Sequence, residues 1–145
     1  MSRTFTNLLA HLIFGTKGRE PFIVPEIKPE LFSYLGGLTR ELQGKAYGIN
    51  GTADHVHMLV NLPPTISVSD ALRNSSGWVH DKWPRRPFAW QPGYGAFSVS
   101  KSNVPGVLKY IGNQEEHHRR ATFQEEFINF LRAHAIEFDE RYVLT

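Results

Sequence analysis

Apolar residues recur along the chain with two different periods, and each period predicts one kind of element. In residues 25–44, leucine and isoleucine recur at three- or four-residue spacing, which is typical of a helix. Pro25 lies near the start of this segment and Gly44 just past its end, as helix boundaries favour. Residues 4–15 are rich in aromatic, β-branched and leucine side chains and lead into a glycine turn. This composition predicts a strand, although the leucine-rich run is also compatible with a helix.

The remaining pattern completes an alternation of strands and helices. Residues 46–50 and 55–61 have the character of strands, and Gly51-Thr52-Ala53-Asp54 between them indicates a hairpin. Further elements are expected as follows: a helix from residues 67–69 to about 83, a strand over 96–100, and helices over 103–118 and 123–135. The order β-α-β-β-α-β predicts an α+β, ferredoxin-like antiparallel sheet packed against two helices, with additional C-terminal helices.

Length and composition limit the class of protein. With 145 residues, 41% of them hydrophobic, the chain is expected to form a single domain over residues 1–145. No run approaches the ~20 apolar residues that a membrane span needs, so no membrane partner and a cytoplasmic location are expected. The absence of cysteine excludes disulfides, a thiolate nucleophile and a cysteine-ligated zinc site. A formal charge of +2 with a pI near 9.0 permits a nucleic-acid partner without requiring one.

Two histidines stand one residue apart at the start of a predicted strand. Because strand side chains alternate between faces, His55 and His57 point to one face and Val56 to the other. Two imidazoles in this arrangement can share one divalent metal ion and leave positions for a phosphate oxygen. The alternative is a pair of half-exposed strand histidines, and His-x-His alone does not decide between them.

A tyrosine and a glutamine lie one helical turn apart in the predicted helix over 103–118. Tyr110 and Gln114 share a face because residues i and i+4 are neighbours on a helix. Tyr110 also borders an apolar stripe, so a half-buried packing tyrosine is the better interpretation of periodicity alone. The functional hypothesis is a phenol that attacks a phosphodiester, with Gln114 offering its amide oxygen to the metal.

Taken together, these fragments resemble a known family. His55-Val56-His57, followed by Tyr110-Ile111-Gly112-Asn113-Gln114, is similar to the HUH and catalytic tyrosine motifs of the single-tyrosine, IS200-like insertion-sequence transposases. This group includes the REP-associated tyrosine transposases. The stretch from Trp90 to Ser100 resembles a signature block of one branch of the family. The likeness continues at residues 15–19, 114–118, 122–127 and 139–142, so it covers nearly the whole chain in order.

The resemblance implies a DNA transposase that cleaves and rejoins single-stranded DNA with hairpin ends, through a 5′-phosphotyrosine intermediate. It implies Tyr110 as the catalytic nucleophile and His55, His57 and Gln114 as ligands of a Mg²⁺ or Mn²⁺ ion. It further implies a homodimer in which the tyrosine helix of one subunit can complete the active site of its partner. A nucleoid-associated location in a prokaryotic cytoplasm follows from the same likeness.

Basic and aromatic side chains are the candidates for contact with DNA. The basic candidates are Lys17, Arg19, Arg73, Lys82, Arg85 and Arg86. Each alone is more often a solvated surface charge, and about half are expected to touch phosphate. The aromatic residues interleaved with them are Trp78, Trp83, Phe88, Trp90 and Tyr94. Aromatic faces can stack on unpaired bases; the alternative is that most of these rings pack in the core, and for Trp78 core packing is the expectation.

Two further hypotheses stay open on the sequence. One is a domesticated protein that binds or nicks hairpin DNA without autonomous transposition. The other is a metal-dependent phosphodiesterase that uses water as its nucleophile. Two glycines depart from what the family would favour: Gly77 stands where relatives often carry a basic residue, and Gly112 should weaken the tyrosine helix by ~1 kcal/mol relative to alanine.

Overall fold

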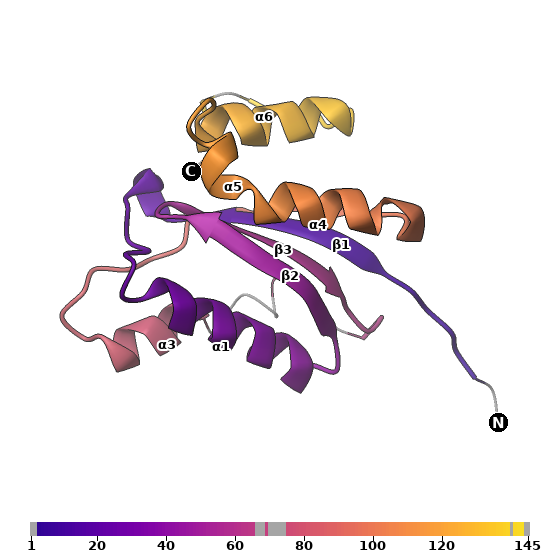
Figure 1. The fold of residues 1–145 in the computed structure, drawn as a ribbon, viewed down its shortest axis with the longest axis horizontal. Helices are drawn as coiled ribbons and strands as arrows, with labels where there is room; N and C mark the ends of the chain where they lie inside the picture. Colours follow the sequence, from indigo (N-terminus) through magenta and orange to yellow (C-terminus); the bar gives the residue numbers. More distant parts are fainter. Residues whose placement is uncertain (1–2, 66–68, 70–74, 140, 144–145) are drawn as a thin grey trace.

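Four strands form one antiparallel sheet with the order β2-β3-β1-β4 (Figure 1). The computed structural model describes residues 3–65, 69, 75–139 and 141–143. The strands are β1 (Leu9–Gly15), β2 (Lys45–Thr52), β3 (His55–Asn61) and β4 (Gly95–Ser98). Because β1 and β2 both pair antiparallel with β3, which lies between them, the first three strands form a split βαβ unit. The predicted α+β, ferredoxin-like fold is confirmed.

Helices cover both faces of the sheet. One face carries α1 (Lys28–Glu41) and α3 (Ser75–Lys82), and the other carries α4 (Val104–Gly112), α5 (Gln114–His117) and α6 (Phe123–Ala133) (Figure 1). Short 3₁₀ turns, η1 (Lys17–Arg19) and η2 (Lys101–Asn103), follow β1 and precede α4. Within the described residues, none of the helices combines the length and the apolar character that a membrane crossing requires.

Alternation along the strands gives each face its own core. The α1 face buries one set of side chains from β1 and β3 against Leu31 and Leu35: Leu12, Phe14, Val56, Met58 and Val60. The opposite face buries Ile13 and Phe97 against apolar side chains of α6: Phe123, Phe127 and Leu131. The three strand histidines are buried and belong to this second face by the same alternation: His11, His55 and His57.

The β2–β3 hairpin is tighter than predicted. The ladder continues to the pair Thr52 and His55, so only Ala53 and Asp54 form the turn. Gly51 allows this close pairing, because a Cβ atom at this position would lie 2.1 Å from the carbonyl oxygen of His55. The turn therefore places Asp54 and Thr52 directly beside the His55 side chain.

The predicted single helix over residues 103–118 is wrong, because the structure breaks it into α4 and α5 at Asn113. Asn113 leaves the helical region, with φ −100° and ψ 22°. Asn50 of β2 donates its amide protons to the carbonyls of Ile111 and Gly112, at 3.0 and 3.3 Å, and so satisfies the end of α4. A long-range contact from the sheet thus ends a helix that local periodicity extends.

Other boundaries move by a few residues. β1 begins at Leu9 rather than at residue 4, α1 is shorter at both ends than 25–44, and α6 ends at Ala133 rather than at residue 135. The predicted start of the second helix, at residues 67–69, lies largely outside the described residues. The described part of that helix, α3, ends at Lys82, close to the predicted end.

Gly51 in the β2–β3 hairpin and Gly112 at the end of α4 give a matched test of the close pairing in the hairpin. We expect Gly51→Ala to lower the free energy of unfolding by roughly 1–3 kcal/mol, because the new methyl group collides with the backbone of β3. Gly112→Ala is the control: among the described residues no atom lies within 4 Å of a Cβ there, so this substitution should not destabilise the protein and should raise the free energy of unfolding by up to ~1 kcal/mol. Urea denaturation followed by circular dichroism measures both, and equal effects of the two substitutions would contradict this account.

Candidate functional site

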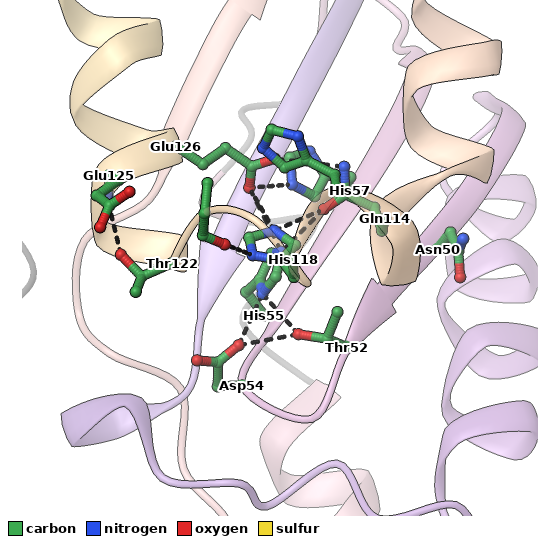
Figure 2. Close-up of polar contacts among 12 residues, drawn as sticks. Asn50, Thr52, Asp54, His55, His57, Gln114, His118, Thr122, Glu125 and Glu126 are labelled. Atoms are coloured by element: carbon green, nitrogen blue, oxygen red, sulfur yellow. Dashed lines mark hydrogen bonds and ion pairs between the residues drawn. The ribbon is translucent and has the colours of Figure 1, made fainter.

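Five buried or nearly buried polar side chains converge on one face of the sheet (Figure 2). His55 and His57 come from β3, Gln114 begins α5, His118 follows α5, and Glu126 lies in the first turn of α6. One potential ligand atom from each of the three histidines and from Glu126 lies within 4.8 Å of the others. The structure therefore brings together the three sequence-predicted metal ligands, and it adds two side chains that the sequence analysis did not single out.

The His55 ring is held on several sides. Its Nδ1 lies 2.8 Å from Asp54 Oδ1 and donates a proton to this carboxylate, which also accepts from Thr52 Oγ1 at 3.0 Å. The ring of Phe123 stacks on the imidazole with the centroids 4.3 Å apart. The other nitrogen, Nε2, points into the cluster and lies 3.0 Å from Gln114 Oε1. The hairpin turn and α6 thus fix which edge of the ring faces the site.

His57 is oriented by a histidine of the neighbouring strand. Its Nδ1 lies 2.7 Å from Nε2 of His11, and its own Nε2 lies 2.9 Å from Glu126 Oε1. Burial, together with the nearby His57, lowers the pKa of His11 to about 3, so His11 stays neutral. The sequence analysis missed His11. The available signal was a polar side chain within a strand that buries both faces, where a polar group needs a partner.

A buried carboxylate lies at the centre of the cluster. Glu126 Oε1 lies 2.9 Å from His57 Nε2, 3.1 Å from His118 Nε2 and 3.4 Å from His55 Nε2. Burial raises the pKa of Glu126, but contacts with the imidazoles of His118, His55 and His57 outweigh burial and hold this pKa far below its usual range. The group is therefore an ionised carboxylate inside the protein.

The same contacts act on the charge of His55. Burial lowers its pKa, but hydrogen bonding to Asp54, Glu126 and Gln114 prevails and raises the pKa of His55 to about 9. The surroundings of the His55 ring therefore favour its protonated, positively charged form. An ordinary core histidine would show the opposite shift, because burial alone favours the neutral ring.

Two of these residues carried signals that the sequence analysis did not use. His118 stands in the basic run His117-His118-Arg119-Arg120, which is typical of positive charge at a helix C-terminus, yet its spacing from Gln114 is that of neighbours on one helix face. Glu126 follows Phe123 and precedes Phe127 on the apolar side of α6. A carboxylate in the apolar stripe of an amphipathic helix indicates a buried partner.

Tyr110 joins the cluster from the last turn of α4. Its hydroxyl donates a hydrogen bond to Glu126 Oε2, and its ring centroid lies 5.8 Å from that of His57. Burial and the neighbouring Glu126 carboxylate both raise the pKa of Tyr110, so the phenol holds its proton. His117 Nε2 lies 3.4 Å from the same hydroxyl.

Tyr110 is also accessible from outside the cluster. It lines a pocket of about 410 Å³ whose other walls include Lys109, His117 and Arg120. A second pocket, of about 290 Å³, touches Tyr110, Glu126 and Phe130 from the α6 side. The phenol therefore connects a buried, charged centre with a solvent-facing hollow that carries positive side chains.

The basic residues predicted to contact DNA do not share one surface. Arg19 donates to Gln124 Oε1 at 2.8 Å, which places it beside the first turn of α6. Lys82 and Arg86 instead lie on the α1 side, where they form ion pairs with Glu30 and Glu26. Lys17 and Arg85 are exposed, and Arg73 lies outside the described residues.

Lys82 also covers aromatic rings. Its Nζ lies 5.3 Å from the ring centroid of Trp78 and 5.4 Å from that of Trp83. Trp78 stacks on Tyr34 and packs against the α1-side core, as expected for a core ring.

Comparison with known proteins assigns the family. The sequence model of the family described as "Transposase IS200 like" matches residues 4–114, which is more than half of the chain. The chain belongs to this family. The match includes His55, His57, Tyr110 and Gln114 and ends before His118 and Glu126.

Relatives and solved structures agree with the IS200-like assignment. Transposases for insertion sequence element IS200 from Salmonella typhimurium and Salmonella typhi are each 28% identical over 127 residues, covering 80% of this chain and 82% of theirs. A candidate transposase from Deinococcus radiodurans R1 matches with a TM-score of 0.61 at 25% identity, over 79% of this chain and 96% of that chain. A REP-associated tyrosine transposase bound to a REP hairpin shares the fold, with a TM-score of 0.62 at 13% identity, over 81% and 73% of the two chains.

The first turn of α6, which carries Glu126, depends on its N-cap. Thr122 Oγ1 accepts a hydrogen bond from the backbone N–H of Glu125 at 3.1 Å (Figure 2). We expect Thr122→Ala to lower the free energy of unfolding by about 1 kcal/mol, because it leaves this N–H without its acceptor. Thr122→Ser keeps the acceptor and should lose much less. Urea denaturation of the three proteins is the measurement, and an equal loss in both variants would argue against the cap.

Proposed function

We propose that this IS200-like transposase cuts and rejoins single-stranded DNA by transesterification, with Tyr110 as its nucleophile. The observation that carries the proposal is the meeting of Tyr110, from α4, with the His55 and His57 pair of β3 through the single carboxylate of Glu126. A tyrosine that only packs in the core needs no buried carboxylate as a partner. Membership of a transposase family supports DNA as the substrate.

The donor set fits a divalent cation. His55 donates from Nδ1 to Asp54, so in the neutral ring its Nε2 carries a lone pair, which faces the Oε1 acceptor of Gln114 at 3.0 Å. Positive charge between these two atoms turns a repulsion into an attraction. We propose that His55, His57 and Gln114 hold a Mg²⁺ or Mn²⁺ ion, as the family likeness implies. When bound, such an ion neutralises charge that develops on the phosphoryl oxygens and orients the phosphate.

The chain's own residues supply the nucleophile and an acceptor for its proton. The pKa of Tyr110 is raised above its ordinary value of ~10, so attack requires the phenolic proton to leave as the new bond forms. Glu126 Oε2 already accepts a hydrogen bond from this hydroxyl, but its lowered pKa makes it a weak base, so it orients the phenol. His117 Nε2, 3.4 Å from the same hydroxyl, is the other acceptor within reach. A bond then forms between Tyr110 Oη and phosphorus, the bond from phosphorus to the 3′ oxygen breaks, and that oxygen takes up a proton in place of the one that Tyr110 has lost. The products are a 5′-phosphotyrosine and a 3′-hydroxyl, and the reverse reaction rejoins the strand without ATP.

The pocket beside Tyr110 suits the approach of a DNA phosphate. Lys109 and Arg120 line it together with His117 and one carboxylate, Glu116, so an incoming phosphate meets two basic side chains and one acidic side chain beside Tyr110. Of the predicted DNA contacts, Arg19 hydrogen-bonds Gln124 of α6 on this side of the sheet, whereas Lys82 and Arg86 lie on the α1 side. The hairpin ligand of the REP-associated structure supports single-stranded DNA with hairpin ends as the substrate.

A covalent adduct tests the nucleophile. An oligonucleotide from the sequence that flanks the gene, incubated with the protein and Mn²⁺, should yield a protein–DNA adduct on a denaturing gel. We expect Tyr110→Phe to abolish the adduct and to leave binding, measured by fluorescence anisotropy, unchanged. Tyr47→Phe is the matched control, since Tyr47 lies on β2 and is 39% exposed, and it should retain the adduct.

The outcomes separate the rival hypotheses. Survival of the adduct in Tyr110→Phe would mean that another residue is the nucleophile. Cleavage without an adduct, kept in Tyr110→Phe and lost in His57→Ala, would indicate water as the nucleophile. Binding of hairpin DNA without cleavage by the unsubstituted protein would favour the domesticated hypothesis.

We also infer that one chain can complete its own active site, because Tyr110 contacts Glu126 of the same chain. The homodimer with a site completed in trans stays a prediction of the family likeness. A mixture of Tyr110→Phe and His57→Ala proteins distinguishes a site assembled within one chain from a site completed in trans. Assembly within one chain predicts no adduct from the mixture, because each chain lacks one required group. Recovery of partial activity, together with a dimer in size-exclusion chromatography with light scattering, would establish assembly in trans.

A further inference from the structure

The proposed chemistry leaves Oε1 of Glu126 and the imidazole of His118 without a role. Both groups lie beyond residues 4–114, the span that the sequence model of the family matches. Glu126 is only 2% exposed and the side chain of His118 is 12% exposed, so neither is an ordinary surface group. Their positions at the centre of the cluster require a physical explanation.

In His55 and His118, the hydrogen bond made by Nδ1 on the outside of the cluster determines whether Nε2, which faces the inside, carries a proton. His118 Nδ1 lies 2.8 Å from the carbonyl oxygen of Ala121, which can only accept, so Nδ1 carries a proton. His55 Nδ1 donates to Asp54 in the same way. In the neutral form, each of these two rings therefore presents an unprotonated Nε2 to the interior of the cluster.

Acceptor atoms consequently face acceptor atoms. Gln114 Oε1 lies 3.0 Å from His55 Nε2 and 3.1 Å from His118 Nε2. Glu126 Oε1 approaches the same two nitrogens, at 3.4 and 3.1 Å, and His57 Nε2 at 2.9 Å. Lone pairs converging in a buried space repel one another unless positive charge lies among them, either as additional protons or as one metal ion.

The spacing of these atoms fits the metal ion. Bonds of about 2.0–2.2 Å to one cation place neighbouring donors roughly 3.0 Å apart in an octahedral site and roughly 3.4 Å apart in a tetrahedral one. The five separations above range from 2.9 to 3.4 Å. The ligand atoms of the three histidines and Glu126 all lie within 4.8 Å of one another, a few tenths of an ångström more than the roughly 4.4 Å that separates opposite ligands of one ion, so a small closure of the cluster brings them into one coordination sphere.

We propose that Glu126 and His118 are two further ligands of the ion, and that the completed site prefers a first-row transition metal ion to Mg²⁺. The proposal rests on the proposed function for the presence of an ion at His55, His57 and Gln114. Three imidazoles in one site favour transition metals, whereas Mg²⁺ prefers an oxygen environment and keeps several waters. The additional ligands thus change the metal preference that His55, His57 and Gln114 alone would set.

The second oxygen of Glu126 gives this ligand a positioning role. Oε2 accepts from the Tyr110 hydroxyl while Oε1 faces the imidazoles, so one carboxylate fixes the nucleophile relative to the ion. α6, which supplies Glu126, is then part of the active site, although it lies outside the segment by which the family is recognised.

Metal affinity tests the proposal without DNA or turnover. After removal of metal with EDTA, the protein is titrated with Mn²⁺, and free Mn²⁺ is measured by its electron paramagnetic resonance signal. Glu126→Gln should weaken Mn²⁺ binding by at least ~10-fold. Glu125→Gln is the matched control, because the neighbouring carboxylate is exposed, and it should bind as the unsubstituted protein does. Equal affinity in Glu126→Gln would overturn the assignment.

His118→Asn provides a second variant in case Glu126→Gln does not fold, and circular dichroism checks folding in both. Nitrogen couplings in the spin-echo spectrum of bound Mn²⁺ should indicate three imidazole ligands in the unsubstituted protein and two in His118→Asn. A ~10-fold excess of Mg²⁺ should leave the Mn²⁺ bound. Unchanged couplings, or displacement by Mg²⁺, would contradict the proposal. Tyr110→Phe should keep the metal affinity of the unsubstituted protein. A failure of the proposed nucleophile, measured by the DNA adduct, is therefore distinguishable from a failure of the proposed metal ligands, measured by Mn²⁺ affinity.

Discussion

The contact between the buried Glu126 carboxylate and the imidazoles around it governs the arrangement of the face of the sheet that carries α4, α5 and α6. An ionised carboxylate loses several kcal/mol of hydration when it is buried alone, so it persists only with positive or proton-donating partners. Here those partners come from β3 and from the segment after α5, while Tyr110 approaches from α4. The contact therefore ties four segments that are distant in the sequence to one point above the sheet. Phe123 stacks on His55, and Phe130 packs beside His57 and Tyr110, so aromatic rings limit the access of water and strengthen each electrostatic interaction inside.

The two faces of the sheet differ in what they bury: one buries an apolar core, and the other also buries the polar cluster. The α1 face is an apolar core built from alternate residues of β1 and β3. The other face combines a smaller apolar cluster with the polar centre, and its histidines are aimed by partners outside the centre: Asp54 and Thr52 for His55, and His11 for His57. Because these partners belong to the hairpin turn and to β1, the rigid sheet, rather than the helices, fixes the positions of the two central imidazoles.

Sequence reasoning succeeded where a short-range rule determines the geometry. The period of two along β3 places His55 and His57 on one face, and the alternation of elements gives the split βαβ order. It failed where a contact across the fold decides the outcome. Asn50 ends α4 from β2, and Glu126 meets the histidines only because α6 folds back over the sheet. His118 stands in a run of basic residues, where the sequence does not distinguish it from a surface charge. Its Nε2 faces inward because Nδ1, on the other side of the ring, donates to the carbonyl oxygen of Ala121.

The break at Asn113 explains how one short segment serves both a buried centre and an accessible nucleophile. In an unbroken helix, Tyr110 and Gln114 would lie on one face and share nearly the same environment. With the break, Gln114 starts a new helix and is fully buried against His55, while Tyr110 stays at the rim and lines two pockets. The proposed function requires such a boundary position, because the phenol would meet a DNA phosphate on one side and a proton acceptor of the protein on the other. The amide of Asn50, by ending α4 one residue before Asn113, makes that position available.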